Sequence, residues 1–226
     1  MVTVYRSPAA IGRVPYPISV VGPAALQRGT TGTSLEEVLR AVPGLQVQNR
    51  FNPAVGERLA MRGFGARAQF GVRGLKVLVD GIPATLPDGQ ATLDHIDPGA
   101  LGRVEVVRGP ASALYGNAAG GVITFETAPA PGGTAAQGGV VAGAYGTRRW
   151  EAGASFGSSA SGVRLNVART TSDGFRADPD RPAERYGSSE RTVLSGRAEH
   201  RLLGGDLVWS LNVLDLGAEN PGAVDR

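Results

Sequence analysis

Cysteine is absent from the 226 residues of the chain, which excludes disulfide frameworks, thiolate zinc sites and cysteine nucleophiles. Lysine is nearly absent too, because Lys76 is the only one and the other 22 basic residues are arginine. Acidic residues are interspersed with the arginines, and the net charge is only +3. This pattern favours arginine-rich codon usage over a nucleic-acid surface, so no nucleic-acid partner is predicted.

Long hydrophobic runs are also missing. No run of about 18 apolar residues occurs, so no segment is expected to span a bilayer as a helix. The start, Met1 to Arg6, has neither the basic nor the apolar region of a signal peptide. His95 and His200 are far apart and have no companion ligands in the sequence, so no metal site and no cofactor are predicted. Transmembrane strands remain possible, because they give no long hydropathy signal.

Glycine and proline are abundant instead, with 34 and 15 residues, which suits many short strands and turns. One helix is well marked in the first half. Its apolar residues recur at i, i+3, i+4 and i+7 from Leu35 to Val42. Thr33 and Ser34 each precede a glutamate by three residues, which is the capping-box spacing, and Pro43-Gly44 ends the helix.

Short strands follow this helix in the sequence. Asp80-Gly81 is a tight-turn dipeptide that leads from one of them into Ile82. The strands are predicted to complete a small mixed sheet. They are expected at residues 45–47, 58–61, 75–79, 104–107 and 122–125.

The second half has a different pattern. Residues 128–136 read as a linker, and the apolar period beyond it becomes two, as in Val163 to Val167 and Leu207 to Val213. About five strands of about ten residues are expected. A short turn at 146–147 and a long polar loop at 172–190 are the arrangement of an outer-membrane barrel. Five strands cannot close a barrel, so we expect a chain truncated at both ends.

Four phrases follow one another in the first half. They are SLEEVLRAVPGLQV at residues 34–47, RGFG at 62–65, VLVDGIP at 77–83 and RVEVVRGPASALYGNAAGGVI at 103–123. In this order they resemble the plug domain of TonB-dependent outer-membrane receptors. The resemblance implies an α+β plug domain, with a small mixed sheet and short helices, followed by an incomplete antiparallel transmembrane β-barrel.

The implied domains are a remnant of the TonB box and its linker at 1–9, the plug at 10–127, a linker at 128–136 and the first strands at 137–226. Glycines in the last phrase are expected to permit positive φ or close backbone approach. The resemblance implies structural contacts between plug and barrel. These are assigned to Arg62, Arg103, Glu105, Arg108, Gly109, Tyr115, Gly116, Gly120 and Gly121.

The resemblance also implies a function, which is capture and energised import of a scarce solute such as a ferric siderophore or similar iron chelate. The expected partners are the periplasmic TonB protein, the extracellular chelate and outer-membrane lipid. Val2, Thr3 and Val4 look like the tail of the coupling segment. The ligand-binding groups at the plug apices are expected to be Arg67, Gln69, Phe70, Thr85, Asp88 and Gln90.

Alternative functions have weaker support in the sequence. RGFG at 62–65 opens like an RNA-binding strand or a dinucleotide fingerprint, but neither the aromatic platform nor the helix that those need follows. A G-x-S-x-G string around Ser155 is followed by Asp173 or Asp178 and then His200, in the order of a serine hydrolase. No helix follows Ser155, so no enzyme is predicted. A passive porin or adhesin barrel would lack the four phrases.

Overall fold

The structure is a computed structural model that describes residues 10–49, 51–68, 71–178 and 181–220. Its contacts divide the chain into two compact units. The first unit comprises the described residues of 10–49, 56–93 and 101–127, and the second those of 51–55, 94–100 and 128–220. Among these residues, no helix combines the length and the apolar character needed to cross a membrane.

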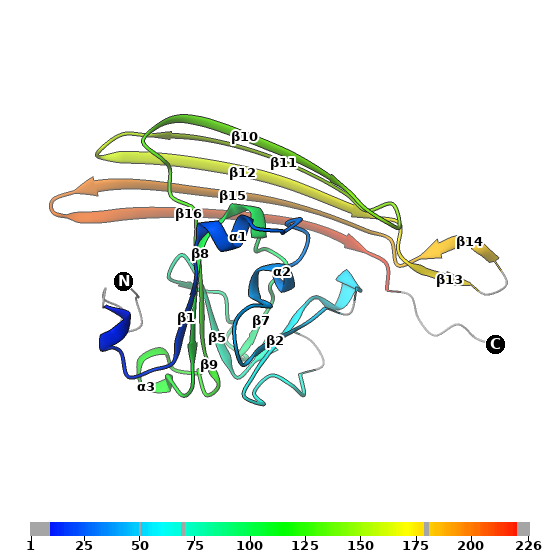
Figure 1. Ribbon diagram of the computed structural model, residues 1–226, viewed down its shortest axis with the longest axis horizontal. Coiled ribbons are helices and arrows are strands. Elements are labelled where there is room, and N and C mark those ends of the chain that lie inside the picture. Colours follow the sequence, from blue (N-terminus) through cyan, green and yellow to red (C-terminus); the bar gives the residue numbers. More distant parts are fainter. Residues whose placement is uncertain (1–9, 50, 69–70, 179–180, 221–226) are drawn as a thin grey trace. The chain divides into compact units, whose positions relative to one another are not determined.

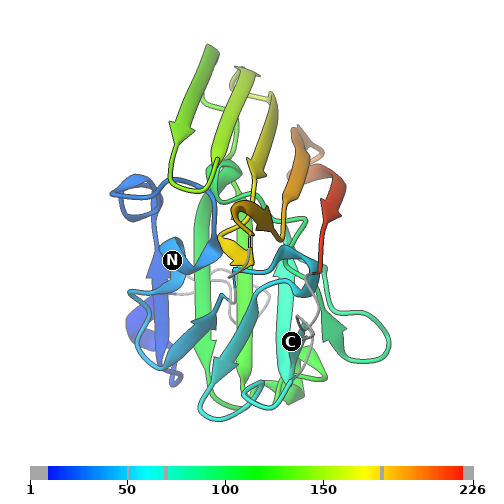
Figure 2. The ribbon, with the colours of Figure 1, turned by 90° about the vertical axis from the view of Figure 1, so that its right-hand side faces the viewer.

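The first unit contains a five-stranded mixed sheet, as predicted. Its pairings are antiparallel except for the parallel pair β5/β9. Figure 2 shows blue β1 at one edge and the green strands β8 and β9 in the middle. In spatial order the strands are β1 (Ile18–Val21), β8 (Leu101–Arg108), β9 (Gly121–Thr127), β5 (Leu75–Val79) and β6 (Ile82–Pro83).

Two smaller pairs complete the strands of this unit. The strands β2 (Leu45–Gln48) and β3 (Arg58–Met61) pair with each other, so the expectation that they join the mixed sheet is wrong. The pattern of apolar residues gives strand positions but not partners, because pairing is decided by tertiary contacts. The other pair is β4 (Val72–Arg73) and β7 (Gln90–Ala91).

The predicted helix is α2 (Leu35–Leu39), and its cap is Ser34, whose Oγ accepts a hydrogen bond of 3.0 Å from the backbone N of Glu36. Glu37 reaches back and accepts from the backbone N of Thr31 at 2.5 Å. The helix is shorter than the apolar stripe, although Val42 is still buried. The remaining helical turns are η1 (Ile11–Arg13), α1 (Pro23–Gln27), η2 (Pro53–Val55), η3 (Pro98–Ala100) and α3 (Ser112–Tyr115).

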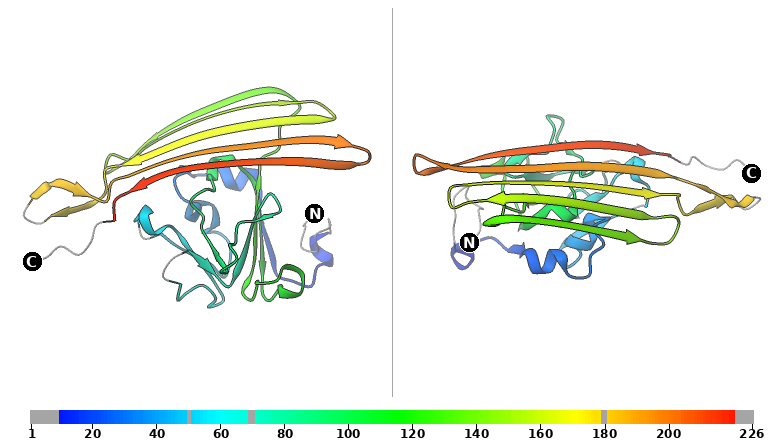
Figure 3. Two further views of the ribbon diagram at one scale, coloured as in Figure 1. Left: turned by 180° about the vertical axis from the view of Figure 1, so that it is seen from behind. Right: turned by 90° about the horizontal axis from the view of Figure 1, so that it is seen from above.

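The second unit is an antiparallel meander of five long strands, which lie side by side in Figures 1 and 3. The first strand begins at Gly133, so the predicted linker at 128–136 is too long. The predicted loop at 172–190 contains a hairpin of β13 (Arg176–Asp178) and β14 (Arg181–Tyr186). The five strands are β10 (Gly133–Ala142), β11 (Arg148–Gly157), β12 (Ser161–Ser172), β15 (Ser189–Leu202) and β16 (Gly205–Ala218).

The meander has two chemically different faces because side chains alternate along each strand. The register runs without a shift along each of its four strand pairings. Phe156, Leu165 and Trp209 share one face and are 48–67% exposed. Asn166 and Ser195 are paired on the other face and are buried. One face therefore suits lipid, and the opposite face is polar.

Candidate functional site

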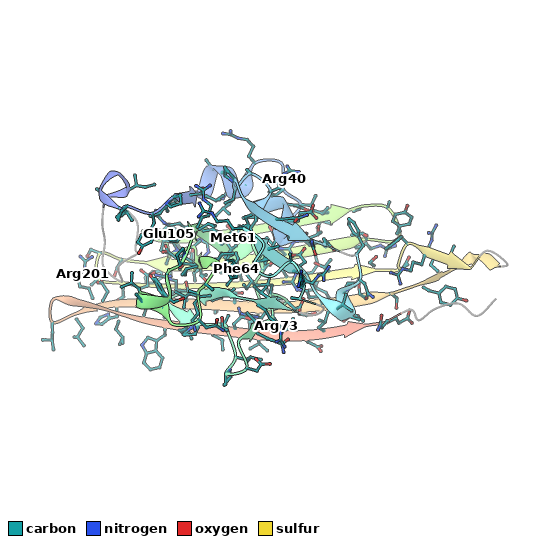
Figure 4. All side chains as sticks on the ribbon, turned by 90° about the horizontal axis from the view of Figure 1, so that it is seen from below. Arg40, Met61, Phe64, Arg73, Glu105 and Arg201 are labelled. Atoms are coloured by element: carbon teal, nitrogen blue, oxygen red, sulfur yellow. The ribbon has the colours of Figure 1, made fainter. Side chains whose placement is uncertain are left out.

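A tight turn at Met61 to Phe64 organises one end of the first unit. The backbone N of each of these two residues donates to the carbonyl O of the other, both at 2.9 Å, and Figure 4 shows the two side by side. Arg62 and Gly63 lie between them at φ +50° and +86°. Positive φ at both central positions is the type I′ geometry. The RGFG phrase is thus a reverse turn and not the strand that an RNA-binding platform needs.

The turn packs against a glycine junction, which we define as Gly74, Gly120 and Gly121. Gly120 donates from its backbone N to the carbonyl O of Gly74 at 2.9 Å. A Cβ on Gly120 would lie 2.6 Å from the Cβ of Phe64, and one on Gly121 would fall on the carbonyl O of Val107. A larger residue at Gly121 would displace backbone, and one at Gly120 would displace the side chains of Phe64 and Leu75. The RGFG phrase at 62–65 and the last phrase at 103–123, which are distant in sequence, therefore meet at this junction.

The other predicted glycines also have the expected conformation. Gly109 and Gly116 lie at φ +118° and +72°, and Gly121 lies at +149°. Gly109 donates from its backbone N to the carbonyl O of Gly120 at 3.0 Å. The conformational part of the prediction is confirmed. A contact of these glycines with a barrel wall stays a prediction.

Arg103, Glu105 and Arg108, three of the predicted charged residues, have partners within the first unit. Arg103 donates from Nη2 to Oε1 of Glu105 at 2.5 Å, and Glu126 lies 3.9 Å from Arg103. The side chain of Glu105, labelled in Figure 4, is only 3% exposed. Arg108 donates to the carbonyl O of Pro43 at 3.0 Å. These contacts link neighbouring segments of the first unit, and the contact of these residues with a barrel stays a prediction.

Tyr115 has a packing role in the same unit. Its side chain is half-buried against a core cluster, and the residue is the last of α3. The cluster joins the mixed sheet to the segment after Gly109. Its buried members are Leu78, Val107, Ala111, Ala118 and Val122.

Three of the predicted ligand-binding residues lie in one loop, between β6 and the end of β7. Gln90 donates to Asp88 twice, from its backbone N at 3.0 Å and from its side-chain Nε2 at 2.7 Å. Thr85 accepts from the backbone N of Val77 at 3.3 Å. Asp88 is exposed and Gln90 is half-buried. The loop thus presents a fixed carboxylate at the surface.

Arg67 lies in a different loop, after the RGFG turn, and its side chain is exposed. Arg58 holds this loop by donating to the carbonyl O of Ala68. Gln69 and Phe70 lie outside the described residues, as do Val2, Thr3 and Val4 of the predicted coupling segment. Their predicted roles stay predictions.

A buried charge cluster in the second unit had no signal in the sequence. It joins the segment 94–100 to the strands β11 and β15. Arg149 donates from Nη2 to Asp97 at 2.9 Å and to Glu151 at 2.5 Å. The side chains of Arg149 and Asp97 are 2% and 3% exposed. Arg191 donates to the carbonyl O of Asp94 at 2.7 Å.

Burial shifts the pKa values of this cluster. It raises the pKa of Asp97 above the usual value, although the charges of Arg149 and Arg191 act in the opposite direction. Burial lowers the pKa of His95, against the raising effect of the Asp94 carboxylate. The acid is therefore harder to ionise and the imidazole harder to protonate than in water. In the described ranges no group of three acidic or histidine side chains is positioned to hold a metal ion.

The serine of the G-x-S-x-G string is not arranged as a nucleophile. Ser155 is buried within the strand β11, whereas a hydrolase needs its serine on a sharp turn between a strand and a helix. Ser155 is in register with Arg164 of β12. His200 instead contacts Ser161, with 2.6 Å between Nδ1 and Oγ. The hydrolase interpretation has no support in this geometry.

The mixed sheet with its glycine junction, followed by long antiparallel strands with one apolar face, defines the class of plugged outer-membrane receptors. A family model described as the TonB-dependent receptor plug domain matches residues 10–122. The chain belongs to the TonB-dependent receptor family. Its relatives are named as receptors and transporters and not as enzymes.

Relatives and solved structures agree with this assignment. The chain is 41% identical over 103 residues to a hemin receptor of Yersinia enterocolitica, and 33% identical over 172 residues to the vitamin B12 transporter BtuB of Photobacterium profundum. These matches cover 44% and 66% of the chain but only 14% and 26% of the relatives. The fold matches the pyoverdine outer-membrane receptor FpvA of Pseudomonas aeruginosa PAO1 with a TM-score of 0.69 at 19% identity. That match covers 91% of the chain and 28% of the receptor.

Proposed function

We propose that the protein acts in an outer-membrane transporter that binds and imports a ferric siderophore or a similar iron chelate. The observation that carries the proposal is the glycine junction, at which the RGFG turn meets the last of the four plug phrases. Several relatives and fold neighbours are named for hemin or siderophores, which supports an iron chelate as the solute. Others are named for vitamin B12. The choice of an iron chelate as the solute is therefore itself proposed.

The apical loops supply the chemistry for binding. Arg67 carries an exposed guanidinium, which suits the negative charge of a ferric chelate. Thr85, Asp88 and Gln90 offer hydrogen-bonding groups on a loop that its own hydrogen bonds hold in shape. A pre-shaped loop loses little conformational entropy on binding. Gln69 and Phe70 follow Arg67 in sequence and complete the proposed site.

The proposed transport step is a switch between two states of the plug. Binding at the apices favours the state in which the segment around Val2, Thr3 and Val4 is accessible to TonB in the periplasm. A pull on this segment then opens a path for the chelate. A passive porin needs neither the plug nor TonB, so dependence on TonB separates the two functions.

Growth of an iron-starved host on one defined ferric chelate tests the proposal. We expect growth that requires both the protein and TonB, and an Asp88→Ala, Gln90→Ala variant that needs about tenfold more chelate, since two polar contacts are lost. Asp206→Asn is the matched control, because Asp206 is an exposed carboxylate outside the proposed site. Growth that continues without TonB would contradict energised import.

A further inference from the structure

Two polar residues lie in contact on the otherwise apolar face of the meander. His200 of β15 and Ser161 of β12 are paired in register, and Nδ1 of His200 lies 2.6 Å from Oγ of Ser161. Because side chains alternate along a strand, both residues share the face of Leu165 and Trp209. Both belong to the second unit. We call His200 and Ser161 the polar pair.

Apolar side chains surround the polar pair on this face. Beyond the pair, Leu202 follows in β15 and is 53% exposed, and Leu207 of β16 lies opposite His200 and is 46% exposed. On the other side of the pair, the next row across the sheet consists of Phe156, Val163, Ala198 and Trp209. The apolar surface therefore continues past the polar pair and does not end at it.

The position of the polar pair along the sheet indicates which leaflet of the membrane it faces. The turn between β15 and β16 is at the end of the sheet opposite the β13–β14 hairpin (Figure 1). The connections at this end are short, since residues 158–160 join β11 to β12 and residues 203–204 join β15 to β16. Outer-membrane barrels have short turns on the periplasmic side and longer loops on the extracellular side. The polar pair therefore faces the periplasmic leaflet.

Hydrogen bonds of the turn at 158–160 fix the position of Ser161. The backbone N of Ser161 donates to Oγ of Ser158 at 3.1 Å, and this hydroxyl donates to the carbonyl O of Ser161 at 3.2 Å. The backbone N of Arg201 donates to the carbonyl O of Ala160 at 2.8 Å, which ties the turn to β15 beside His200. The hydroxyl that contacts the imidazole is thus presented from a fixed backbone.

The contact with Ser161 uses one of the two nitrogens of the His200 ring. When the hydroxyl donates to Nδ1, the ring proton is on Nε2, which is then a hydrogen-bond donor. His200 is exposed, and within the described part of the chain its only recorded hydrogen-bonding contact is with Ser161. A donor that faces hydrocarbon without an acceptor costs free energy. An ionisable side chain on a surface covered by lipid therefore indicates a functional site.

The aromatic belt of membrane proteins explains only part of this surface. Phe156 and Trp209 suit the boundary between acyl chains and headgroups, where aromatic rings are favoured. A belt requires neither an imidazole held by a hydroxyl nor leucines farther out. Leu203, at the tip of the turn between β15 and β16, is nevertheless 99% exposed. A directed donor with apolar surface on both sides fits an amphiphile that carries an anionic group.

We infer that the polar pair binds the phosphate of a phospholipid in the periplasmic leaflet. Nε2 of His200 donates to a phosphate oxygen, and the acyl chains lie along Val163 and Trp209. The negative phosphodiester is an ionised acceptor, and the low dielectric constant of the surroundings strengthens a hydrogen bond to it. The site is separate from the plug apices, so the inference does not depend on which solute is transported.

Quenching of Trp209 fluorescence by lipids with brominated acyl chains tests the inference. The chain has two tryptophans, so a Trp150→Phe background leaves Trp209 as the reporter beside the site. The full chain in maltoside micelles, which contain no phosphate, is titrated with brominated phosphatidylglycerol and with brominated diacylglycerol. We expect half-maximal quenching at a mole fraction about tenfold lower for the phospholipid, since it adds a hydrogen bond to a charged group.

Variants of the polar pair should lose this preference for the phospholipid. In His200→Leu and Ser161→Ala, we expect the two lipids to quench Trp209 at equal mole fractions. Quenching by the diacylglycerol should stay as in the background chain, which separates loss of the phosphate contact from loss of folding. His200→Leu places an apolar side chain on an apolar face, so it suits the folded state.

Two matched variants are the controls. Arg201→Gln removes a cation next to His200 in sequence, whose side chain contacts Asp206 and lies on the opposite face. Thr192→Ala removes a hydroxyl from the same face of β15, near the other end of the strand. Both variants should keep the tenfold preference.

Three results would overturn the inference. One is equal quenching of the background chain by the two lipids, and another is a preference that survives in both variants of the polar pair. The third is loss of the preference when millimolar inorganic phosphate is added, because the site would then be one for free phosphate. All three results would leave the proposed function standing.

Discussion

Asp97 and Arg149 form an ion pair of 2.9 Å in which both side chains are almost completely removed from solvent. The pair joins a short segment between β7 and β8 to β11, a long strand of the meander. Ionised groups at such depth are stable only while their partners remain in place. Several properties of the protein should therefore depend on this contact.

Removal of one partner should destabilise the protein strongly. Arg149→Met leaves Asp97 buried without its cation, and we expect a loss of about 3–5 kcal/mol in unfolding free energy. The double variant Arg149→Met, Asp97→Leu should recover most of the loss, since neither charge of the pair is then left buried without the other. Urea unfolding in detergent micelles, followed by circular dichroism, measures both. Arg201→Gln, which breaks an exposed ion pair, should cause no measurable change.

The pKa shift of His95 predicts the pH dependence of stability. Because burial lowers its pKa in the folded state, His95 contributes stability above about pH 6.5, and this is lost as the pH falls. The raised pKa of Asp97 has the opposite sign, with a contribution that is present at acid pH and lost as the pH rises. The unmodified chain should therefore lose more stability between pH 7 and pH 5 than His95→Gln. Equal losses would contradict the prediction, and His200→Gln controls for removal of an imidazole.

The glycine junction should tolerate no side chain. Gly121→Ala combines a φ of +149° with a contact against the carbonyl of Val107, so we expect a loss of about 1–3 kcal/mol. Gly132→Ala is the control, because nothing lies within 4 Å of its Cβ position. Chemical unfolding of the two variants under identical conditions measures the difference. Equal stability would show that the junction can relax.

Depth in the bilayer should decide the effect of charges on the apolar face. Leu165 lies midway along β12, and Leu207 lies near the start of β16. Leu165→Arg should cost about 2–4 kcal/mol in folding into lipid vesicles, and Leu207→Arg only about 0–1 kcal/mol. Tryptophan emission during refolding into vesicles measures both. The reverse order would contradict the assignment of this face to lipid.

Local sequence patterns predicted the positions of helices, turns and strands more reliably than they predicted which strands pair. The cap at Ser34 and the turn at Asp80-Gly81 follow from short-range chemistry, and both were predictable. The parallel pairing of β5 with β9 was not, since about forty residues separate the strands and a prediction of pairing needs tertiary contacts. The start of β10 was missed because its first residues are small and resemble a linker.

The candidate sites also divide into contacts between residues close in sequence, which could be predicted, and contacts made only by the fold, which could not. Asp88 and Gln90 are two residues apart, so a hydrogen bond between them within one loop could be predicted from the sequence. The contact between the rings of Phe51 and Phe175 could not, because these residues are far apart in sequence and approach each other only through the fold. The segment at Asp97 had no signal either, since a lone aspartate in a short loop gives no indication of a buried cation from β11.

The unshifted register of the meander has a consequence for sequence change. Each residue of β12 is fixed opposite one residue of β11 or β15, and alternate residues face different media. Insertion of a single residue in the middle of β12 would turn every later side chain of that strand to the opposite face. An insertion before Leu165, for example, would place Leu165 on the polar face and Asn166 on the apolar face. The same insertion in the loop at 173–175 would be absorbed locally. Insertions and deletions in this chain should therefore be tolerated only in the loops, whereas the strands should vary by substitution.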